Sequence, residues 1–271
     1  MPDYLVYLTV GYNPEFSKLV DLCVKSIFAT NDRSTIDICI MCDDHYSQYI
    51  RHLPVKIHIT DTNTTPVIAS MRKLEVFNIP GIEKYKKVLF LDGDILVTKS
   101  LLPIFEAASD PAKLYVFEET EYENPHTSIY FSHVTYTPEE LKVLQENNIK
   151  GFNCGQFLFA PTPEMKQHFS NIIQKMNNFK GQFHYEQSFM NVYFNSDLTL
   201  TDRTMLQEHV KIYPEYKTLY PSKTILHFTG TTEYTKLERM VSIIAFKDWF
   251  YKKYPNKLGK WLRKDHVEHH L

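Results

Sequence analysis

An acidic triplet at the end of an apolar run constrains this chain more than any other feature. Val88 to Leu91 form an uninterrupted apolar run, which is typical of a buried strand in a parallel sheet. Asp92, Gly93 and Asp94 follow at once, although burying an unpaired carboxylate costs several kcal/mol. An extended backbone would point the two carboxylates to the same side. The pattern therefore predicts a divalent cation as their partner.

A polar strand-to-turn junction is the alternative interpretation, since Asp and Gly are ordinary turn residues. Ile95 to Val97 argue against this alternative, because three apolar residues directly after the triplet indicate that the chain stays buried there. Gly93 lacks a side chain and would let a bulky ligand approach the backbone. In open α/β sheets, ligands bind at the carboxyl ends of the strands, where this triplet is expected.

Composition narrows the class of protein. The 271 residues, 43% of them hydrophobic, suit a folded α/β protein, and the net charge of -2 argues against nucleic acid as a partner. No window of about 20 apolar residues predicts a membrane span, and no basic region typical of a signal peptide opens the sequence. The cytosol is therefore the expected compartment. The oligomeric state stays open, and a homodimer is one alternative.

Strands alternate with helices over the first 100 residues, which predicts a mostly parallel, doubly wound sheet. We expect a single domain over 1–271, with a polar insertion at about 118–150 and a C-terminal helix at about 233–254. The expected strands are 4–10, 36–42, 55–60, 87–91, 156–160 and 224–228. The expected helices before the C-terminal one are 14–29, 69–77, 138–147, 163–179 and 186–194.

Several segments in chain order resemble one family, glycosyltransferase family 8, which includes glycogenin and plant galactinol synthase. Leu89 to Phe105 is similar to the family's metal motif, an Asp-x-Asp after an apolar strand. The other similar segments are Thr9 to Ile27, Lys73-Leu74, Phe152 to Gly155, Glu186 to Asn191 and Ile225 to Gly230. Each short motif is weak alone, but together they cover roughly residues 4–232 in the family's order.

The resemblance implies a GT-A type nucleotide-diphospho-sugar transferase fold. It also implies transfer of a hexose (glucose, galactose or N-acetylglucosamine) from a UDP-sugar to a hydroxyl acceptor, with retention of anomeric configuration. The acceptor would be a glycan, a protein or a small polyol. A divalent cation would neutralise the charge that develops on the leaving diphosphate. By the resemblance, Mn²⁺ is the expected metal and Mg²⁺ the alternative.

His227 joins Asp92 and Asp94 as a metal ligand by this resemblance. A histidine beside apolar residues is more often a core residue, so the resemblance carries the assignment. An imidazole added to carboxylate oxygens favours Mn²⁺ over Mg²⁺.

The resemblance also implies the catalytic and donor-binding residues. Glu186 and Gln187 match an acid-amide pair beside the anomeric carbon, where a carboxylate would stabilise oxocarbenium character. The alternative for Glu186 is an exposed residue that opens a helix. The expected UDP-sugar contacts are Thr9, Gly11, Tyr12, Lys73, Asp92, Gly93, Asp94, Asn153, Gly155, Gly230 and Lys236. Arg72 could take the role of its neighbour Lys73, and Asn153 would act from a turn that includes Gly155.

One departure from the family concerns phosphate binding. The family follows its His-Phe-x-Gly with Lys-Pro-Trp, whose lysine reaches the diphosphate, but Glu233 stands at that position here. We expect Lys236 or Arg239 to replace it. A second departure is Ile212 at the self-glucosylated tyrosine of glycogenin, which favours a separate acceptor.

Two other functions stay open. A haloacid-dehalogenase-like, Mg²⁺-dependent phosphohydrolase also ends an apolar strand in Asp-x-Asp. It normally does so at the first strand, and the later acidic pair that it needs has only Asp197 and Asp202 as candidates. A catalytically silent UDP-sugar binder is the other alternative, because the Lys-Pro-Trp is missing.

Overall fold

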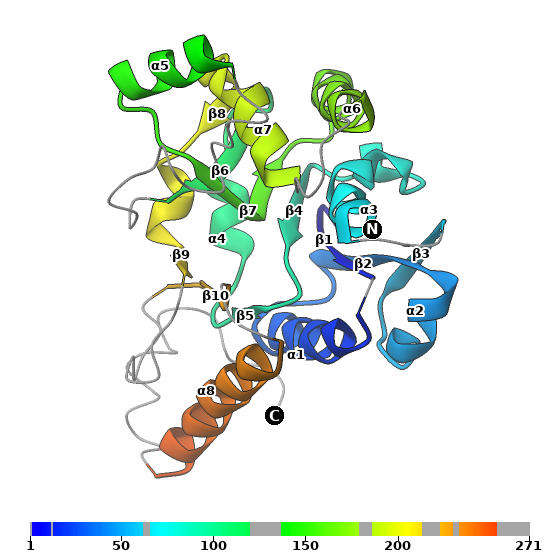
Figure 1. The fold of residues 1–271 in the computed structure, drawn as a ribbon. Helices are drawn as coiled ribbons and strands as arrows, with labels where there is room; N and C mark the ends of the chain where they lie inside the picture. Colours follow the sequence, from blue (N-terminus) through cyan, green and yellow to red (C-terminus); the bar gives the residue numbers. More distant parts are fainter. Residues whose placement is uncertain are drawn as a thin grey trace.

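A seven-stranded sheet forms the centre of the computed structural model, which describes residues 2–11, 13–61, 66–119, 137–178, 186–212, 223–229 and 233–253 (Figure 1). The strand order is β3-β2-β1-β4-β7-β6-β8. In chain order these strands are β1 (Tyr4–Val10), β2 (Ile36–Asp43), β3 (Lys56–Thr60), β4 (Lys87–Leu91), β6 (Leu114–Glu118), β7 (Phe152–Phe159) and β8 (Thr201–Asp202). Strands β1 to β4 run parallel, whereas β7 is antiparallel to both β4 and β6.

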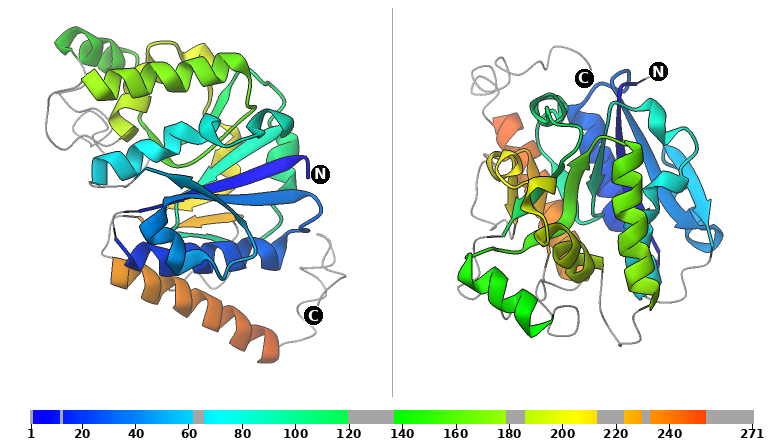
Figure 2. Two further views of the ribbon diagram at one scale, coloured as in Figure 1. Left: turned by 90° about the vertical axis from the view of Figure 1, so that its right-hand side faces the viewer. Right: turned by 90° about the horizontal axis from the view of Figure 1, so that it is seen from above.

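Helices cover both faces of this sheet (Figure 2). On one face lies α1 (Glu15–Thr30) with α8 (Glu233–Lys253) beside it, and on the other lie η1 (Arg72–Asn78), α6 (Pro163–Asn178) and α7 (Glu186–Asn195). Because side chains alternate along a strand, β1 contributes to two apolar cores. Val6 and Leu8 pack toward α1, while Tyr7 packs toward α6 and α7.

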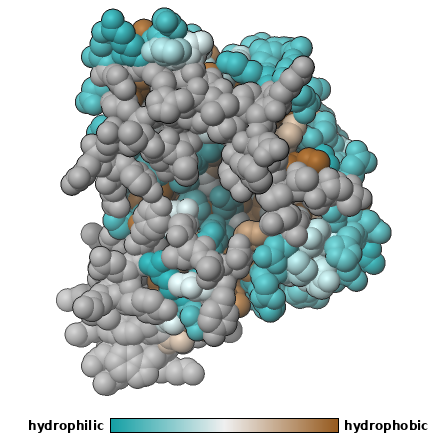
Figure 3. Space-filling view, viewed as in Figure 1, coloured by the Kyte–Doolittle hydropathy of each residue, from teal (hydrophilic) through white to brown (hydrophobic). Residues whose placement is uncertain are grey.

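The remaining helices are short. They are α2 (Asp44–Ile50), α3 (Pro66–Met71), η2 (Ile82–Lys84), α4 (Leu102–Ala107), α5 (Pro138–Glu146), η3 (Leu198–Leu200) and η4 (Met205–Glu208). None of the described helices is long and apolar enough to cross a membrane. On the face seen in Figure 3, the described surface is mainly hydrophilic.

A second, three-stranded sheet has the order β5-β10-β9. Its strands are β5 (Ile95–Val97), β9 (Val210–Ile212) and β10 (Ile225–His227). The chain passes from β4 through a turn at Gly93-Asp94 directly into β5. Since β10 pairs antiparallel with β5, with His227 opposite Ile95, this small sheet carries His227 to the acidic triplet.

The alternation of strands and helices confirms the mostly parallel sheet with flanking helices. One expected element is wrong: Phe152 to Gly155 belong to strand β7 and do not form a turn. All eight residues of β7 are buried between β4 and β6, and its pairing with β6 shifts register between Val116 and Phe117. The polar insertion includes α5, but its residues 120–136 lie outside the described residues.

Candidate active site

Asp92, Asp94 and His227 converge where β4 and β10 end. One possible ligand atom from each lies within 4.8 Å of the others. His227 Nε2 is 3.2 Å from Asp94 Oδ1 and 3.8 Å from Asp92 Oδ2. The spacing of the two aspartates suggested an extended backbone, but Gly93 and Asp94 form a turn. The turn and the pairing of β10 with β5 bring the three side chains together.

The residues of this cluster fit a divalent cation. Asp94 Oδ1, which faces His227 Nε2 at 3.2 Å, is buried and makes no hydrogen bond. Such an atom is costly unless another partner is available to the site. Gly155 keeps the space open, because a Cβ there would lie 2.1 Å from His227 Cε1 and 2.8 Å from Asp92 Oδ2. Two carboxylates and an imidazole are donors that suit Mn²⁺ among other divalent cations.

Two lysines neutralise the aspartates. Lys73 Nζ lies 3.0 Å from Asp92 Oδ1 and 2.5 Å from Glu186 Oε1. Lys236 Nζ, from α8, lies 2.7 Å from Asp94 Oδ2. Of these five side chains, Asp92 is the most exposed at 27%. The site therefore combines three carboxylates with two ammonium groups in a largely dehydrated place.

The charges of this network reinforce one another. Burial lowers the pKa of Lys73, but Asp92 and Glu186 outweigh it and raise that pKa above its ordinary value. Burial raises the pKa of the Asp94 carboxyl, but His227 and Lys236 outweigh it and hold that pKa below its ordinary value. Lys73 is therefore charged and Asp94 ionised at neutral pH.

Replacing Lys73 with methionine should lower the free energy of unfolding by about 3–5 kcal/mol, as expected when one partner of a buried ion pair is removed. Asp92 and Glu186 would then face each other without their shared positive partner. Urea unfolding measures the loss. Lys25→Met is the matched control, because its pair with Asp21 lies on the surface of α1. A loss no larger than that of the control would contradict the structural role of Lys73.

Glu186 and Gln187 begin α7 beside this network. The Glu186 side chain is 4% exposed, so the alternative of an exposed helix start is wrong. Gln187 Oε1 accepts a hydrogen bond of 2.9 Å from the backbone N–H of Cys154 in β7. Asn191, one turn later, accepts from the N–H of Phe152 and donates to its carbonyl. These bonds tie α7 to β7.

The other expected donor contacts are spread over two strands. Thr9 and Gly11 lie at the carboxyl end of β1, the strand that pairs in parallel with β4. Asn153 is buried in β7, where its Oδ1 accepts a hydrogen bond from the N–H of Gly155. Tyr12 and Gly230 lie outside the described residues.

The structure distinguishes the members of two pairs of candidate residues by their contacts. Lys73, and not Arg72, reaches the site carboxylates, since Arg72 pairs with Glu75. Lys236 reaches Asp94, whereas the Arg239 guanidinium lies over the Phe228 ring at 5.9 Å.

Gly93 serves the packing of a helix. A Cβ at this position would lie 2.5 Å from Val20 Cγ2 on α1. The missing side chain therefore makes room for α1, a reason for the glycine that the local sequence did not indicate. Access of a ligand to the backbone here stays a prediction.

Tyr7 supports the site and was missed by the sequence analysis. Its hydroxyl donates a hydrogen bond to the backbone carbonyl of Lys73, and the side chain is fully buried. Burial raises the pKa of Tyr7, and the charges of Asp92 and Glu186 raise it further, so the phenol stays protonated. A tyrosine within a buried apolar strand was the available signal, because a buried hydroxyl usually has a partner.

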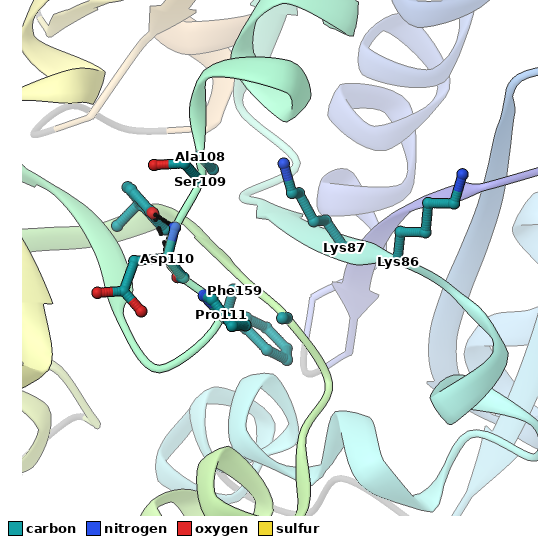
Figure 4. A pocket seen from close by; sticks show the side chains of 9 residues that line it. Lys86, Lys87, Ala108, Ser109, Asp110, Pro111 and Phe159 are labelled. Atoms are coloured by element: carbon teal, nitrogen blue, oxygen red, sulfur yellow. Dashed lines mark hydrogen bonds between the residues drawn. The ribbon is translucent and has the colours of Figure 1, made fainter.

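A separate small cavity lies at the opposite end of β4 (Figure 4). Its lining includes Lys86, Lys87 and Asp110, and Lys87 donates a hydrogen bond to the carbonyl of Phe105. Its volume of about 70 Å³ is too small for a nucleotide sugar, since ligand pockets usually enclose about 300–1,000 Å³.

Comparison with protein families shows which family the sequence matches. The family described as "Glycosyl transferase family 8" matches residues 7–246. No curated protein matches the sequence significantly.

Three solved structures with a similar fold are glycosyltransferases. The galactosyltransferase LgtC, solved with donor and acceptor sugar analogues, has a TM-score of 0.56 at 14% identity, covering 88% of this chain and 95% of LgtC. Mouse xyloside xylosyltransferase 1 has a TM-score of 0.52 at 12% identity, with 84% and 97% covered. The bifunctional WbbM has a TM-score of 0.58 at 14% identity, with 91% of this chain covered. The chain spans about half of WbbM, 51%. These similarities confirm the GT-A type fold.

Proposed function

Because the chain belongs to glycosyltransferase family 8, we propose that it transfers a hexose from a UDP-sugar to a hydroxyl acceptor with retention of the anomeric configuration. Family membership decides against the phosphohydrolase alternative. The observation that carries the proposal is the meeting of Asp92, Asp94 and His227 with Lys73 and Glu186 in one buried network.

Asp92, Asp94 and His227 would hold the divalent cation in this proposal, with Mn²⁺ as the first candidate and Mg²⁺ as the second. When bound, such a cation acts as a Lewis acid that neutralises charge on the leaving diphosphate. Lys236 takes the place of the missing family lysine, because it reaches the same site from α8.

Glu186 and Gln187 are assigned to the reacting sugar. Lys73 holds the Glu186 carboxylate beside Asp92. The negative charge of Glu186 would stabilise oxocarbenium character at the anomeric carbon. Gln187 has a different task. Its carbonyl oxygen already accepts from Cys154 N–H, so the amide nitrogen is the group left to donate to a sugar hydroxyl.

The acceptor is proposed to be a separate molecule. Ile212 ends strand β9 with 3% of its surface exposed, and its side chain carries no hydroxyl. Its neighbour Tyr213 lies outside the described residues.

The test begins with UDP alone. UDP should raise the melting temperature by several degrees when Mn²⁺ is present and not when EDTA replaces it, because ligands that bind only the folded state stabilise it. A panel of UDP-glucose, UDP-galactose, UDP-N-acetylglucosamine and UDP-xylose with Mn²⁺ should then show slow release of UDP from one donor. Binding of UDP without release from any donor would favour the silent binder, and no effect of UDP would contradict the proposal.

A further inference from the structure

We infer that Tyr7 is a positioning residue of the proposed sugar transfer, which acts by fixing Lys73 in the buried network of the site. This inference rests on the proposed function and adds a side chain that acts through another one. It starts from two contacts of Lys73 that are not ion pairs. The Tyr7 hydroxyl donates a hydrogen bond to the Lys73 carbonyl, and the Lys73 ammonium lies 5.2 Å from the centre of the Phe90 ring.

Three aromatic rings form one row across the centre of the sheet. Tyr7 in β1 is the register partner of Phe90 in β4, and Phe90 is the register partner of Phe157 in β7. All three side chains are fully buried. The centres of the Tyr7 and Phe157 rings each lie 4.9 Å from the centre of the Phe90 ring. Because neighbouring strands hold these rings, the aromatic row cannot shift without repacking the core.

Lys73 depends on this support because of the element that carries it. The η1 segment is a 3₁₀-helix of seven residues, whereas 3₁₀ runs longer than about four residues are uncommon because their hydrogen-bond geometry is poor. Restricting a long lysine side chain also costs conformational entropy. The bond from Tyr7 fixes the backbone at Lys73, and the face of the Phe90 ring attracts the ammonium group.

A displaced Lys73 would no longer hold the carboxylate that is assigned to the reacting sugar. Lys73 Nζ lies 2.5 Å from Glu186 Oε1 and 3.0 Å from Asp92 Oδ1, so a small shift of the lysine lengthens both contacts. A misplacement of about 1 Å can cost roughly a hundredfold in rate, even when the change lies away from the reacting atoms. Tyr7 therefore acts on the chemical step through Lys73 and Glu186.

Steady-state kinetics of Tyr7→Phe with the active donor tests this inference. Phenylalanine keeps the ring in the aromatic row and removes only the hydroxyl. We expect kcat to fall by about ten- to a hundredfold, while KM changes by less than about threefold. When Glu186→Gln is already present, adding Tyr7→Phe should lower kcat by no more than about twofold, because both changes act through the same carboxylate.

Tyr115→Phe is the matched control. Tyr115 is also a buried tyrosine in a strand, and its hydroxyl donates to the backbone carbonyl of Asp110. It lines the small cavity at the opposite end of β4, so its loss should leave kcat unchanged.

A folded Tyr7→Phe protein with the kcat of the wild type would overturn the inference, whether or not its stability falls. Losses of kcat that multiply in the double variant with Glu186→Gln would overturn it as well. If Tyr7→Phe does not fold, Phe90→Leu tests the other contact of Lys73: it removes the ring near the ammonium and should lower kcat by about tenfold. A normal kcat in that variant would overturn the inference. In all these cases the wild-type protein still releases UDP, so the proposed function stands. A wild-type protein that releases UDP from no donor would instead overturn both.

Discussion

Replacing Asp92 and Asp94 together with asparagine should abolish the stabilisation by UDP and Mn²⁺ and lower sugar transfer by at least about a thousandfold. Asparagine keeps the shape of the side chains but removes both negative charges that face His227. The remaining imidazole cannot hold a hard divalent cation against water. The melting temperature with and without UDP and Mn²⁺ measures the first effect, and release of UDP from the active donor measures the second.

The control for this double variant is Asp3→Asn with Asp44→Asn. Both control aspartates form ion pairs with exposed side chains, so they lose the same charge without touching the cluster. Lys73 and Lys236 lose their aspartate partners in the site variant. Circular dichroism is therefore needed to check that this variant is folded. Retention of the effect of UDP and Mn²⁺ in a folded site variant would show that the metal assignment is wrong.

Glu186→Gln should lower kcat by roughly 10²–10⁴-fold while the affinity for UDP with Mn²⁺ changes little. Glutamine preserves volume and keeps an oxygen for Lys73, but it cannot supply a negative charge to the anomeric carbon. Loss of kcat with an unchanged KM is expected when an interaction is made mainly in the transition state. Steady-state kinetics with the active donor separates the two constants.

Glu15→Gln is the control for this variant, because Glu15 pairs with Lys18 on the exposed side of α1. A Glu186→Gln protein with normal kcat and reduced stability would contradict the catalytic role. Glu186 would then be only a structural partner of Lys73.

Local sequence patterns predicted most of the fold and many residues of the candidate site. The spacing of apolar residues predicted the strands and helices, because the buried face repeats every second residue in a strand and about every 3.6 residues in a helix. Asp92, Asp94 and His227 were found from residue type at strand ends together with family resemblance.

Contacts between distant segments could not be predicted in this way. Lys236 lies 142 residues from Asp94, and the pairing of β10 with β5 and the packing of α8 bring the two side chains together. The strand at Phe152 to Gly155 resembles a turn by composition, but pairing on both sides keeps it extended. The close approach of Gly93 to Val20 could not be predicted either, because Val20 lies on a helix far away in the sequence.

The chemistry that the site can perform therefore depends on two kinds of information. Residue type and periodicity specify which groups the chain offers and which elements carry them, since both act over a few residues. The neutralisation of Asp92 and Asp94 by lysines, and the hydrogen bond from Tyr7 to Lys73, follow from strand register and helix packing. Register and packing depend on burial over the whole chain, so these contacts exist only in the folded molecule.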